Sequence, residues 1–265
     1  MTKPKVFVTR RLVQEALDRL DREVDLTVWP GEDPPSRQTL IESLEHAEGL
    51  LCLLTDSIDA EILSGAKNLM AVSNLATGYN NIDVEAATRL GIPVGNTPGV
   101  LDKTTADYAF ALILASSRRL IEADRHVRQG NWHTWEPLGF LGQDVHEATL
   151  GIVGLGAIGL EVAKRAIGFG MRVVYHTRTR RQHEEALFDL EYAERLEDLL
   201  QVADIVTLHL PLTSDTYQLI DTEALQIMKP TAVLVNTGRG PLIDTMALYH
   251  CLLYTSPSPR DQRGS

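Results

Sequence analysis

The feature that most constrains the fold of this chain is a glycine pattern at residues 154–159, which read Gly-Leu-Gly-Ala-Ile-Gly. The pattern follows an apolar run, Leu150–Gly154, and precedes a segment with helical spacing of apolar residues that reaches Gly168. In such a unit the first glycine permits the tight turn and the second lets a pyrophosphate approach the backbone. The third lets the helix pack closely on the strand, and the helix N-terminus faces the phosphates. A glycine turn without a ligand is the alternative, but the flanking strand and helix favour a dinucleotide-binding unit.

Short apolar runs alternate with amphipathic segments over most of the chain, which predicts parallel sheets covered by helices. Arg11–Leu20 is one amphipathic segment, and residues 104–120 form a longer predicted helix. Gln129–Gly142 is rich in Gly, Trp and Pro and is predicted to be a loop. The predicted strands are Lys5–Thr9, Val24–Val28, Gly49–Leu54, Met70–Asn74 and Pro93–Gly95, then Leu150–Gly154, Arg172–His176, Asp204–Leu208 and Ala232–Val235. The sequence therefore predicts two α/β units joined by a helix.

The composition excludes several other classes of protein. Lys and Arg total 25 against 36 Asp and Glu, and the net charge of −11 argues against nucleic acids and anionic membranes as partners. No apolar run is long enough to cross a bilayer, and the first residues lack the apolar region of a signal peptide. Only Cys52 and Cys251 occur, which excludes a disulfide framework and a cysteine-rich zinc module. We therefore expect a cytoplasmic protein without a bound metal.

The end of the strand after the glycine pattern bears on the choice of cofactor. A protein that binds NAD usually carries an acidic residue about 20 positions beyond the glycines, where it holds the ribose hydroxyls. Here the strand Arg172–His176 leads into a turn without a carboxylate. The residues of this turn are Thr177, Arg178, Thr179, Arg180 and Arg181. Since a guanidinium can bind a 2′-phosphate through two hydrogen bonds, the turn favours NADP(H), with NAD(H) possible. A solvated basic turn is the alternative interpretation.

Two other loops directly follow predicted strands, at the sheet edge where α/β proteins bind ligands. One loop, Asn236–Gly240, contains Arg239, whose guanidinium can hold the carboxylate of a 2-oxo acid and polarise its carbonyl. A surface arginine in a turn is the alternative there. The other loop, Asn74–Asp83, contains Gly78 and backbone N–H groups that can form a nest for a small carboxylate.

Spaced motifs in this chain resemble those of the D-isomer-specific 2-hydroxyacid dehydrogenases, and within them the glyoxylate/hydroxypyruvate reductases. The motifs are Thr77–Asp83, Asn96–Val100, Ala106–Ala109, Val127–Trp132, Trp135–Leu138, residues 154–159, His209–Thr213 and Asn236–Gly240. The resemblance covers residues 5–250. The tryptophan-containing loop and the turn Thr177–Thr179 favour the reductases.

This resemblance implies two doubly wound parallel-sheet domains and a homodimer of the full-length protein. Residues 1–98 would form part of a flavodoxin-like substrate domain, and residues 99–250 a Rossmann-type dinucleotide-binding domain that is incomplete at its C-terminus. Arg239 matches the catalytic arginine, and the backbone of Thr77 and Gly78 matches the site of the substrate carboxylate. The positions that match cofactor-binding residues are Leu155, Gly156, Ala157, Ile158, Gly159, Thr177, Arg178, Thr179, His209, Pro211, Thr237, Gly238 and Arg239.

One part of the family's machinery has no match in this chain. The family uses a histidine oriented by a glutamate as its general acid, and both lie in the last quarter of the family's chain. His209 belongs to a different motif. The other histidines, which match no such motif either, are His46, His126, His133, His146, His176, His183 and His250. Residues 251–265 resemble a translated sequencing adapter, so we interpret them as a non-native tail that packs on nothing. We therefore expect a C-terminally truncated and inactive chain.

The leading hypothesis is that the intact protein transfers a hydride from NADPH to a small 2-oxo acid, glyoxylate or hydroxypyruvate, to give the 2-hydroxy acid. The alternative within the family is an NAD-dependent dehydrogenase of the phosphoglycerate or D-lactate type. The absence of an acidic residue at position 177 counts against it. A hypothesis from another functional class is that the protein is a non-catalytic, NAD(P)-sensing module like the family's corepressors. Reduction of glyoxylate by NADPH discriminates between these hypotheses.

Overall fold

The computed structural model describes residues 2–255, and the chain divides into two compact units, Met1–Leu101 and Asp102–Ser265. The division falls shortly after residue 98, where the first domain was predicted to end. That the first unit binds the substrate and the second unit the dinucleotide stays a prediction.

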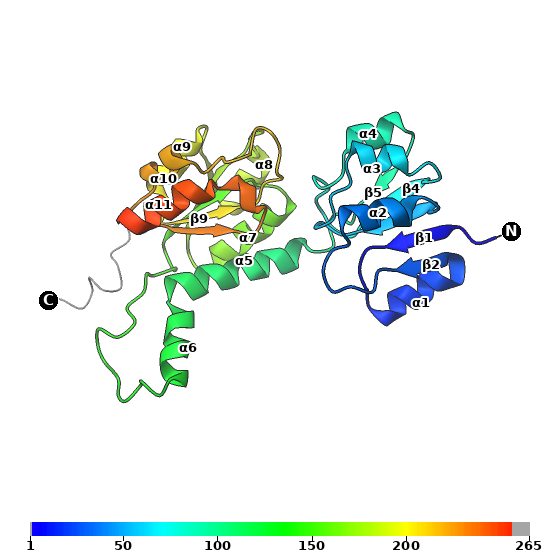
Figure 1. Ribbon diagram of the computed structural model, residues 1–265. Helices are drawn as coiled ribbons and strands as arrows, with labels where there is room; N and C mark the ends of the chain where they lie inside the picture. The colour runs from blue at the N-terminus through cyan, green and yellow to red at the C-terminus, as the bar shows by residue number, and fades with distance from the viewer. Residues whose placement is uncertain (1, 256–265) are drawn as a thin grey trace. The chain divides into compact units, whose positions relative to one another are not determined.

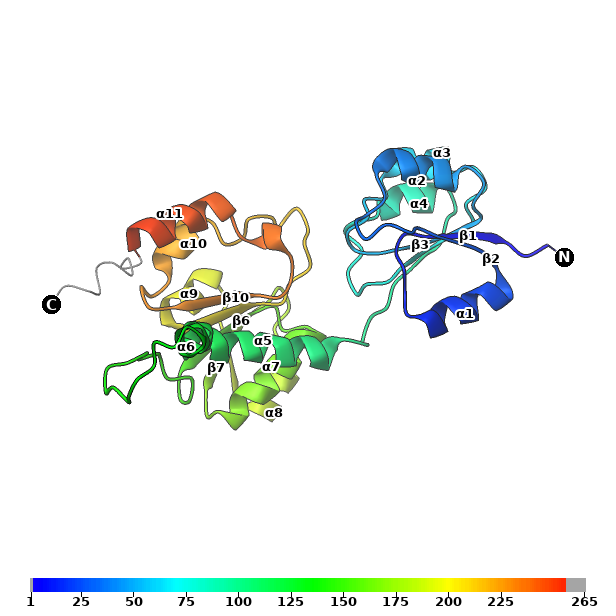
Figure 2. The ribbon, with the colours of Figure 1, turned by 60° about the horizontal axis from the view of Figure 1, so that its bottom comes forward.

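The first unit is built on a five-stranded parallel sheet (Figure 1). Its strands lie in the order β2-β1-β3-β4-β5, which is the flavodoxin-like order that the sequence analysis expected. The strands are β1 (Lys5–Val8), β2 (Asp25–Val28), β3 (Gly49–Cys52), β4 (Ala71–Asn74) and β5 (Val94–Gly95). The helices are α1 (Gln14–Glu23), α2 (Arg37–Leu44), α3 (Ala60–Gly65) and α4 (Val84–Arg89). Figure 2 shows α1 on one face of this sheet and the other three helices on the opposite face.

Short polar residues fix where α2, α3 and α4 begin. The Asp59 carboxylate accepts hydrogen bonds from two backbone N–H groups in the first turn of α3, and the Asp83 carboxylate accepts one in α4. The face covered by α2, α3 and α4 buries a continuous apolar cluster that includes Phe7, Leu50 and Val72 of the strands. The loops after β3 and β4 are therefore anchored at both ends, by the sheet and by a capped helix.

The second unit is built on another five-stranded parallel sheet, in the order β10-β9-β6-β7-β8. The strands are β6 (Thr149–Val153), β7 (Arg172–His176), β8 (Leu190–Tyr192), β9 (Ile205–Leu208) and β10 (Val233–Asn236). The helices are α5 (Asp102–Ser117), α6 (Leu120–Arg128), α7 (Ala157–Gly168), α8 (Gln182–Phe188), α9 (Leu196–Val202), α10 (Thr222–Ile227) and α11 (Thr245–Thr255), and Gly240–Leu242 forms a short 3₁₀ helix. The prediction of two doubly wound α/β sheets is confirmed.

Two apolar clusters cover the two faces of this second sheet. Helices α5 and α7 pack on one face, and α9, α10 and α11 pack on the other (Figure 2). The chain runs outward from β6 to β7 and β8 and then returns to β9 on the other side of β6. In sheets of this kind ligands bind where the strand order reverses, outside the carboxyl ends of the strands. That point lies between β6 and β9.

Three local expectations were wrong. The predicted helix over 104–120 is interrupted at Arg119, which has a φ of +53°, so that α5 ends and α6 begins there. Strand β8 was not predicted. The predicted tail from residue 251 was expected to pack on nothing, yet α11 continues to Thr255 and Cys251 packs against the apolar cluster of α9 and α10. The rest of that tail, residues 256–265, lies outside the described part of the chain. None of the helices between residues 2 and 255 is long and apolar enough to cross a membrane.

Candidate dinucleotide and substrate site

The turn after β6 has the tight geometry that its glycines predict. Gly154 has a φ of +99°, and a Cβ atom there would lie 2.6 Å from the carbonyl oxygen of His209. Its N–H donates to the carbonyl oxygen of His176 at 2.9 Å. The turn is thus held between the ends of β7 and β9, at the point where the strand order reverses. Any side chain at position 154 would both strain the backbone and collide with the loop after β9.

The other two glycines of the pattern have opposite surroundings. A Cβ atom at Gly159 would collide with the carbonyl oxygen of Gly154, so this glycine lets α7 pack against the turn. Gly156 is exposed at the N-cap of α7, and a Cβ atom there would meet nothing within 4 Å. Open space in front of the N-terminus of a helix is the environment that a pyrophosphate requires. The geometry of residues 154–159 therefore fits a dinucleotide.

Neighbouring side chains of the glycine pattern divide between core and surface. Leu155 is buried in the apolar cluster under α5 and α7, so only its backbone can face a ligand. Ala157 is exposed and Ile158 is half-buried. Leu155 was predicted to bind the cofactor, but its side chain packs in the core.

His209 connects the end of β9 to the turn after β10. Its Nε2 lies 2.9 Å from the Thr207 hydroxyl, and its Nδ1 lies 3.3 Å from the Thr237 hydroxyl. Burial lowers the pKa of His209 to about 4, so the imidazole is neutral near pH 7. A neutral ring with both nitrogens engaged is a poor proton donor. This residue is therefore suited to holding the two loops together beside Gly154.

The turn after β10 is held by Asn236. The side-chain oxygen of Asn236 accepts a hydrogen bond from Gly238 N at 2.9 Å, and its amide nitrogen donates to Arg239 O at 2.8 Å. Gly238 is closely packed, because a Cβ atom there would lie 3.0 Å from Leu242. The two contacts fix the backbone that carries the half-buried Arg239 side chain. Sequence reasoning assigned no role to Asn236, although an asparagine two residues before a glycine is a common turn signal.

The turn after β7, which was predicted to lack a carboxylate, has one brought to it by a helix. Thr177 is half-buried, and Arg178 and Thr179 are exposed. The sequence shows no carboxylate in the turn, but α8 brings Glu185 to Arg180, with Nη2–Oε2 at 2.8 Å. Arg180 is therefore occupied by an ion pair. Among the residues that the structure describes, Arg178 has no hydrogen bond or ion pair.

In the first unit, Thr77 and Gly78 follow β4 in a loop held from both sides. The Asn74 amide donates to Gly78 O at 2.8 Å, and the Asn96 amide donates to Thr77 O at 2.7 Å. Within residues 2–255 no acceptor faces the backbone N–H groups of Thr77 and Gly78. Backbone N–H groups that are fixed in this way and left without acceptors can bind a small anion.

A buried carboxylate supports that loop from beneath, and sequence reasoning missed it. Asp56 is 2% exposed and accepts hydrogen bonds from the Thr9 hydroxyl at 2.5 Å and from Leu53 N at 2.7 Å. The Asn81 amide donates to the carbonyl oxygens of Leu53 and Asp56. The loops after β1, β3 and β4 therefore form one polar network at the carboxyl edge of the sheet. Only the placement of Asp56 in the loop after a strand hinted at this.

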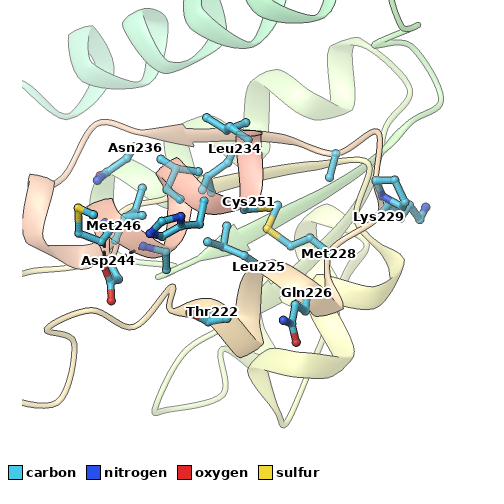
Figure 3. A pocket seen from close by; sticks show the side chains of 17 residues that line it. Thr222, Leu225, Gln226, Met228, Lys229, Leu234, Asn236, Asp244, Met246 and Cys251 are labelled. Carbon is cyan, nitrogen blue, oxygen red and sulfur yellow. Dashed lines mark hydrogen bonds between the residues drawn. The ribbon is translucent and has the colours of Figure 1, made fainter. Parts of the chain in front are cut away.

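Figure 3 shows a separate apolar pocket between β10, α10 and α11. Residues such as Leu225, Met228 and Leu234 line it. Asn236, which holds the turn that carries Arg239, also lines it, but none of the residues predicted to bind cofactor or substrate does. The pocket therefore does not belong to the site formed by the glycine turn and its neighbours.

Comparison with known proteins identifies the class of protein. A sequence profile described as "D-isomer specific 2-hydroxyacid dehydrogenase, NAD binding domain" matches residues 110–255. A glyoxylate reductase of Korarchaeum cryptofilum is 50% identical over 251 residues, which cover 94% of this chain and 75% of that protein. The chain belongs to the D-isomer specific 2-hydroxyacid dehydrogenase family. Within this family of NAD(P)-dependent oxidoreductases it is similar to the glyoxylate reductases, as the sequence analysis predicted.

Solved structures show the same relationship. The TT0316 protein from Thermus thermophilus matches with a TM-score of 0.86 at 44% identity, over 94% of this chain and 78% of that chain. An acyclic imino acid reductase in complex with NADPH and D-arginine matches with a TM-score of 0.83 at 29% identity, over 95% of this chain and 80% of that chain. The cofactor of this chain is a nicotinamide dinucleotide.

Proposed function

We propose that this protein binds NADPH in preference to NADH and uses it to reduce glyoxylate or hydroxypyruvate to the 2-hydroxy acid. The observation that carries the substrate class is the 50% identity to a glyoxylate reductase over 94% of the chain. The preference for NADPH is supported by the turn after β7, where Arg178 is exposed and has no partner among the described residues.

The residues of the second unit would hold the cofactor as follows. The open backbone at Gly156 accommodates the pyrophosphate, and Ala157 and Ile158 begin the helix that faces it. Thr177, Arg178 and Thr179 would hold the 2′-phosphate of the adenosine. His209 and Pro211 would lie by the nicotinamide or the adenosine, and Thr237 and Gly238 would line the cofactor. When bound, the dinucleotide supplies a hydride.

The 2-oxo acid is bound by charge and by backbone donors. Arg239 carries a planar guanidinium that can grip a carboxylate and a carbonyl oxygen together and stabilise negative charge that develops on that oxygen. Considered by itself, the first unit offers the backbone N–H groups of Thr77 and Gly78, which have no acceptor in residues 2–255 and would suit a small carboxylate.

Proton transfer is the step for which this sequence offers no matching residue. His209 is neutral at pH 7 and engaged at both nitrogens, and no other histidine matches the family's general acid. We therefore assign His209 the role of holding the two loops together, and assign proton transfer to no histidine of these 265 residues.

The experiment titrates the purified chain and its Arg178→Ala variant with NADPH and NADH, following nicotinamide fluorescence. A bidentate contact to phosphate contributes about 1.5–3 kcal/mol, so we expect Arg178→Ala to weaken NADPH binding roughly ten- to hundredfold and leave NADH binding unchanged. Arg128→Ala on α6, which removes an exposed arginine paired with Asp124, is the matched control. Equal losses for both cofactors would exclude the 2′-phosphate role. Glyoxylate-dependent NADPH oxidation, measured alongside, tests the proposed reaction.

A homodimer is proposed on the basis of an exposed apolar surface on α6 and the loop that follows it, which extend from the body of the second unit (Figure 1). In this loop Trp132 is 60% exposed, Trp135 76% and Leu138 80%. Large apolar side chains gathered in one exposed segment are typical of protein interfaces, and tryptophan is enriched there. A second copy of the chain is the proposed occupant.

A further inference from the structure

The turn after β7, residues 177–181, is held at both ends by tyrosine hydroxyls. At its far end Arg181 N donates to the Tyr175 hydroxyl at 2.7 Å. At its near end the Tyr192 hydroxyl donates to Thr177 O at 3.4 Å. Tyr175 lies on β7 and Tyr192 on the adjacent strand β8, and their rings are 5.4 Å apart. The sheet therefore fixes the backbone of the turn from below.

Glu185 and Arg180 complete this network. The Tyr175 hydroxyl donates to Glu185 Oε1 at 2.6 Å, and the same carboxylate accepts hydrogen bonds from Arg180 Nε at 2.9 Å and Nη2 at 2.8 Å. The Arg180 guanidinium also lies 5.4 Å from the centre of the Tyr192 ring. These contacts hold Arg180 beside the turn and keep it away from a ligand.

The network is intact near neutral pH. Burial raises the pKa of Tyr175 to about 12, so its hydroxyl stays protonated and can donate and accept at once. The hydrogen bond from Arg180 lowers the pKa of Glu185, so its carboxylate stays ionised. Between the two held ends lies Arg178, exposed and without a partner in the described chain. The turn therefore presents this guanidinium from a fixed backbone.

We infer that Tyr175 and Tyr192 are positioning residues that set the selectivity of this site for a 2′-phosphorylated adenosine over an unphosphorylated one. The inference rests on the proposed preference for NADPH. Neither hydroxyl has to touch the ligand, because each acts through the backbone of the turn. A guanidinium binds a phosphate through two hydrogen bonds only when its orientation is correct. A more mobile turn should therefore weaken binding of the 2′-phosphate while binding of the rest of the nucleotide is retained.

The experiment measures binding of adenosine 2′,5′-bisphosphate and of 5′-AMP to the 265-residue chain by calorimetry. Two variants, Tyr175→Phe and Tyr192→Phe, each remove one hydroxyl and keep the ring. Tyr108→Phe on α5, where the side chain is 61% exposed, is the matched control. Tyr175→Phe removes both the hydrogen bond from Arg181 N and the one to Glu185, and we expect it to weaken binding of the bisphosphate roughly three- to tenfold. Tyr192→Phe should have a smaller effect because its bond is longer, and 5′-AMP should bind all variants equally.

The outcomes that would overturn the inference can be distinguished from one another. If the unchanged chain binds the two nucleotides equally, the proposed NADPH preference is wrong and the inference is wrong with it. If the unchanged chain prefers the bisphosphate and Tyr175→Phe keeps the full preference, only the inference is wrong. Equal weakening for both nucleotides would show a merely structural role. If thermal unfolding shows that Tyr175→Phe does not fold, Tyr192→Phe decides, and an unchanged preference there overturns the inference.

Discussion

Arg239 illustrates how a single side chain in this protein depends on the turn that carries it. The Asn236 amide holds the turn on both sides of Gly238, so the arginine starts from a fixed backbone. We predict that Arg239→Lys weakens binding of oxamate, an analogue of a 2-oxo acid, to the NADPH-loaded chain by about 1–2 kcal/mol, because lysine keeps the charge but loses the planar fork. Calorimetry measures this, with NADPH affinity of the same variant as the control. Unchanged oxamate binding would remove Arg239 from the substrate site.

His209 gives a prediction about pH. Its pKa is lowered from 6.5 to about 4 by burial, so the unfolded chain takes up a proton at this residue before the folded chain does. Stability is therefore unaffected by this residue above pH 6.5, falls as the pH drops from 6.5 toward 4, and levels off below. At about 1.36 kcal/mol per unit the loss amounts to about 3 kcal/mol. Urea unfolding from about pH 7 to about pH 4 should show a shallower decline for His209→Gln than for the unchanged chain. Parallel curves would contradict the assignment.

The role of a single residue could be predicted from the sequence when its partners lie close to it along the chain. The positive φ of Gly154 and the close approach of Gly159 to Gly154 O depend on backbone geometry within a few residues, and the glycine pattern predicted a tight turn and close packing there. Asp56 and Glu185 were missed because their partners, Thr9 and Arg180 with Tyr175, are brought to them by strand pairing and helix packing. A buried carboxylate has no local sequence signal that separates it from an exposed one.

Among the elements, α7 offers a matched pair of glycine substitutions. Gly156→Ala adds a methyl group into open space, so we predict that the chain folds normally but binds NADPH more weakly. Gly159→Ala adds the same group against Gly154 O, and forcing this contact should cost roughly 1–3 kcal/mol of stability. Thermal unfolding and fluorescence titration of both variants test this. Loss of stability in Gly156→Ala with retained NADPH affinity would contradict the assignment of the pyrophosphate to this turn.

The elements themselves were predicted where their apolar pattern was long enough. The predicted strand Arg172–His176 coincides with β7, and most others differ only at their ends. Strand β8 was missed because three residues, Leu190–Tyr192, give no periodic pattern. The break between α5 and α6 was missed because Arg119 adopts a left-handed conformation without a glycine or proline to signal it. Cys251 was assigned to the tail because residues 251–265 resemble a translated sequencing adapter. Its packing against the apolar cluster of α9 and α10 is a tertiary contact that local sequence does not show.

At the scale of the whole molecule, the remaining exposed apolar surface of the second unit predicts self-association. Trp132, Trp135 and Leu138 are each at least 60% exposed, and in water such surface favours burial at about 25 cal/mol per Å². We therefore predict that the chain of 29.3 kDa sediments as a dimer and that replacing these three residues by serine yields a monomer. The loss of three anchors should weaken association by about 3 kcal/mol or more, roughly a hundredfold or greater.

Sedimentation velocity over a concentration series distinguishes a dimer from a monomer and from larger assemblies. Leu187→Ser on α8 removes another apolar side chain, 62% exposed, from outside the loop and serves as the control. It should leave the dimer intact, because scattered exposed apolar residues are ordinary on a monomer surface whereas a contiguous group marks an interface. A monomer for the unchanged chain, or a dimer that survives the triple substitution, would place the contact elsewhere. Concentration-dependent species larger than a dimer, abolished by the same substitutions, would show that the loop joins copies without closing a two-fold pair.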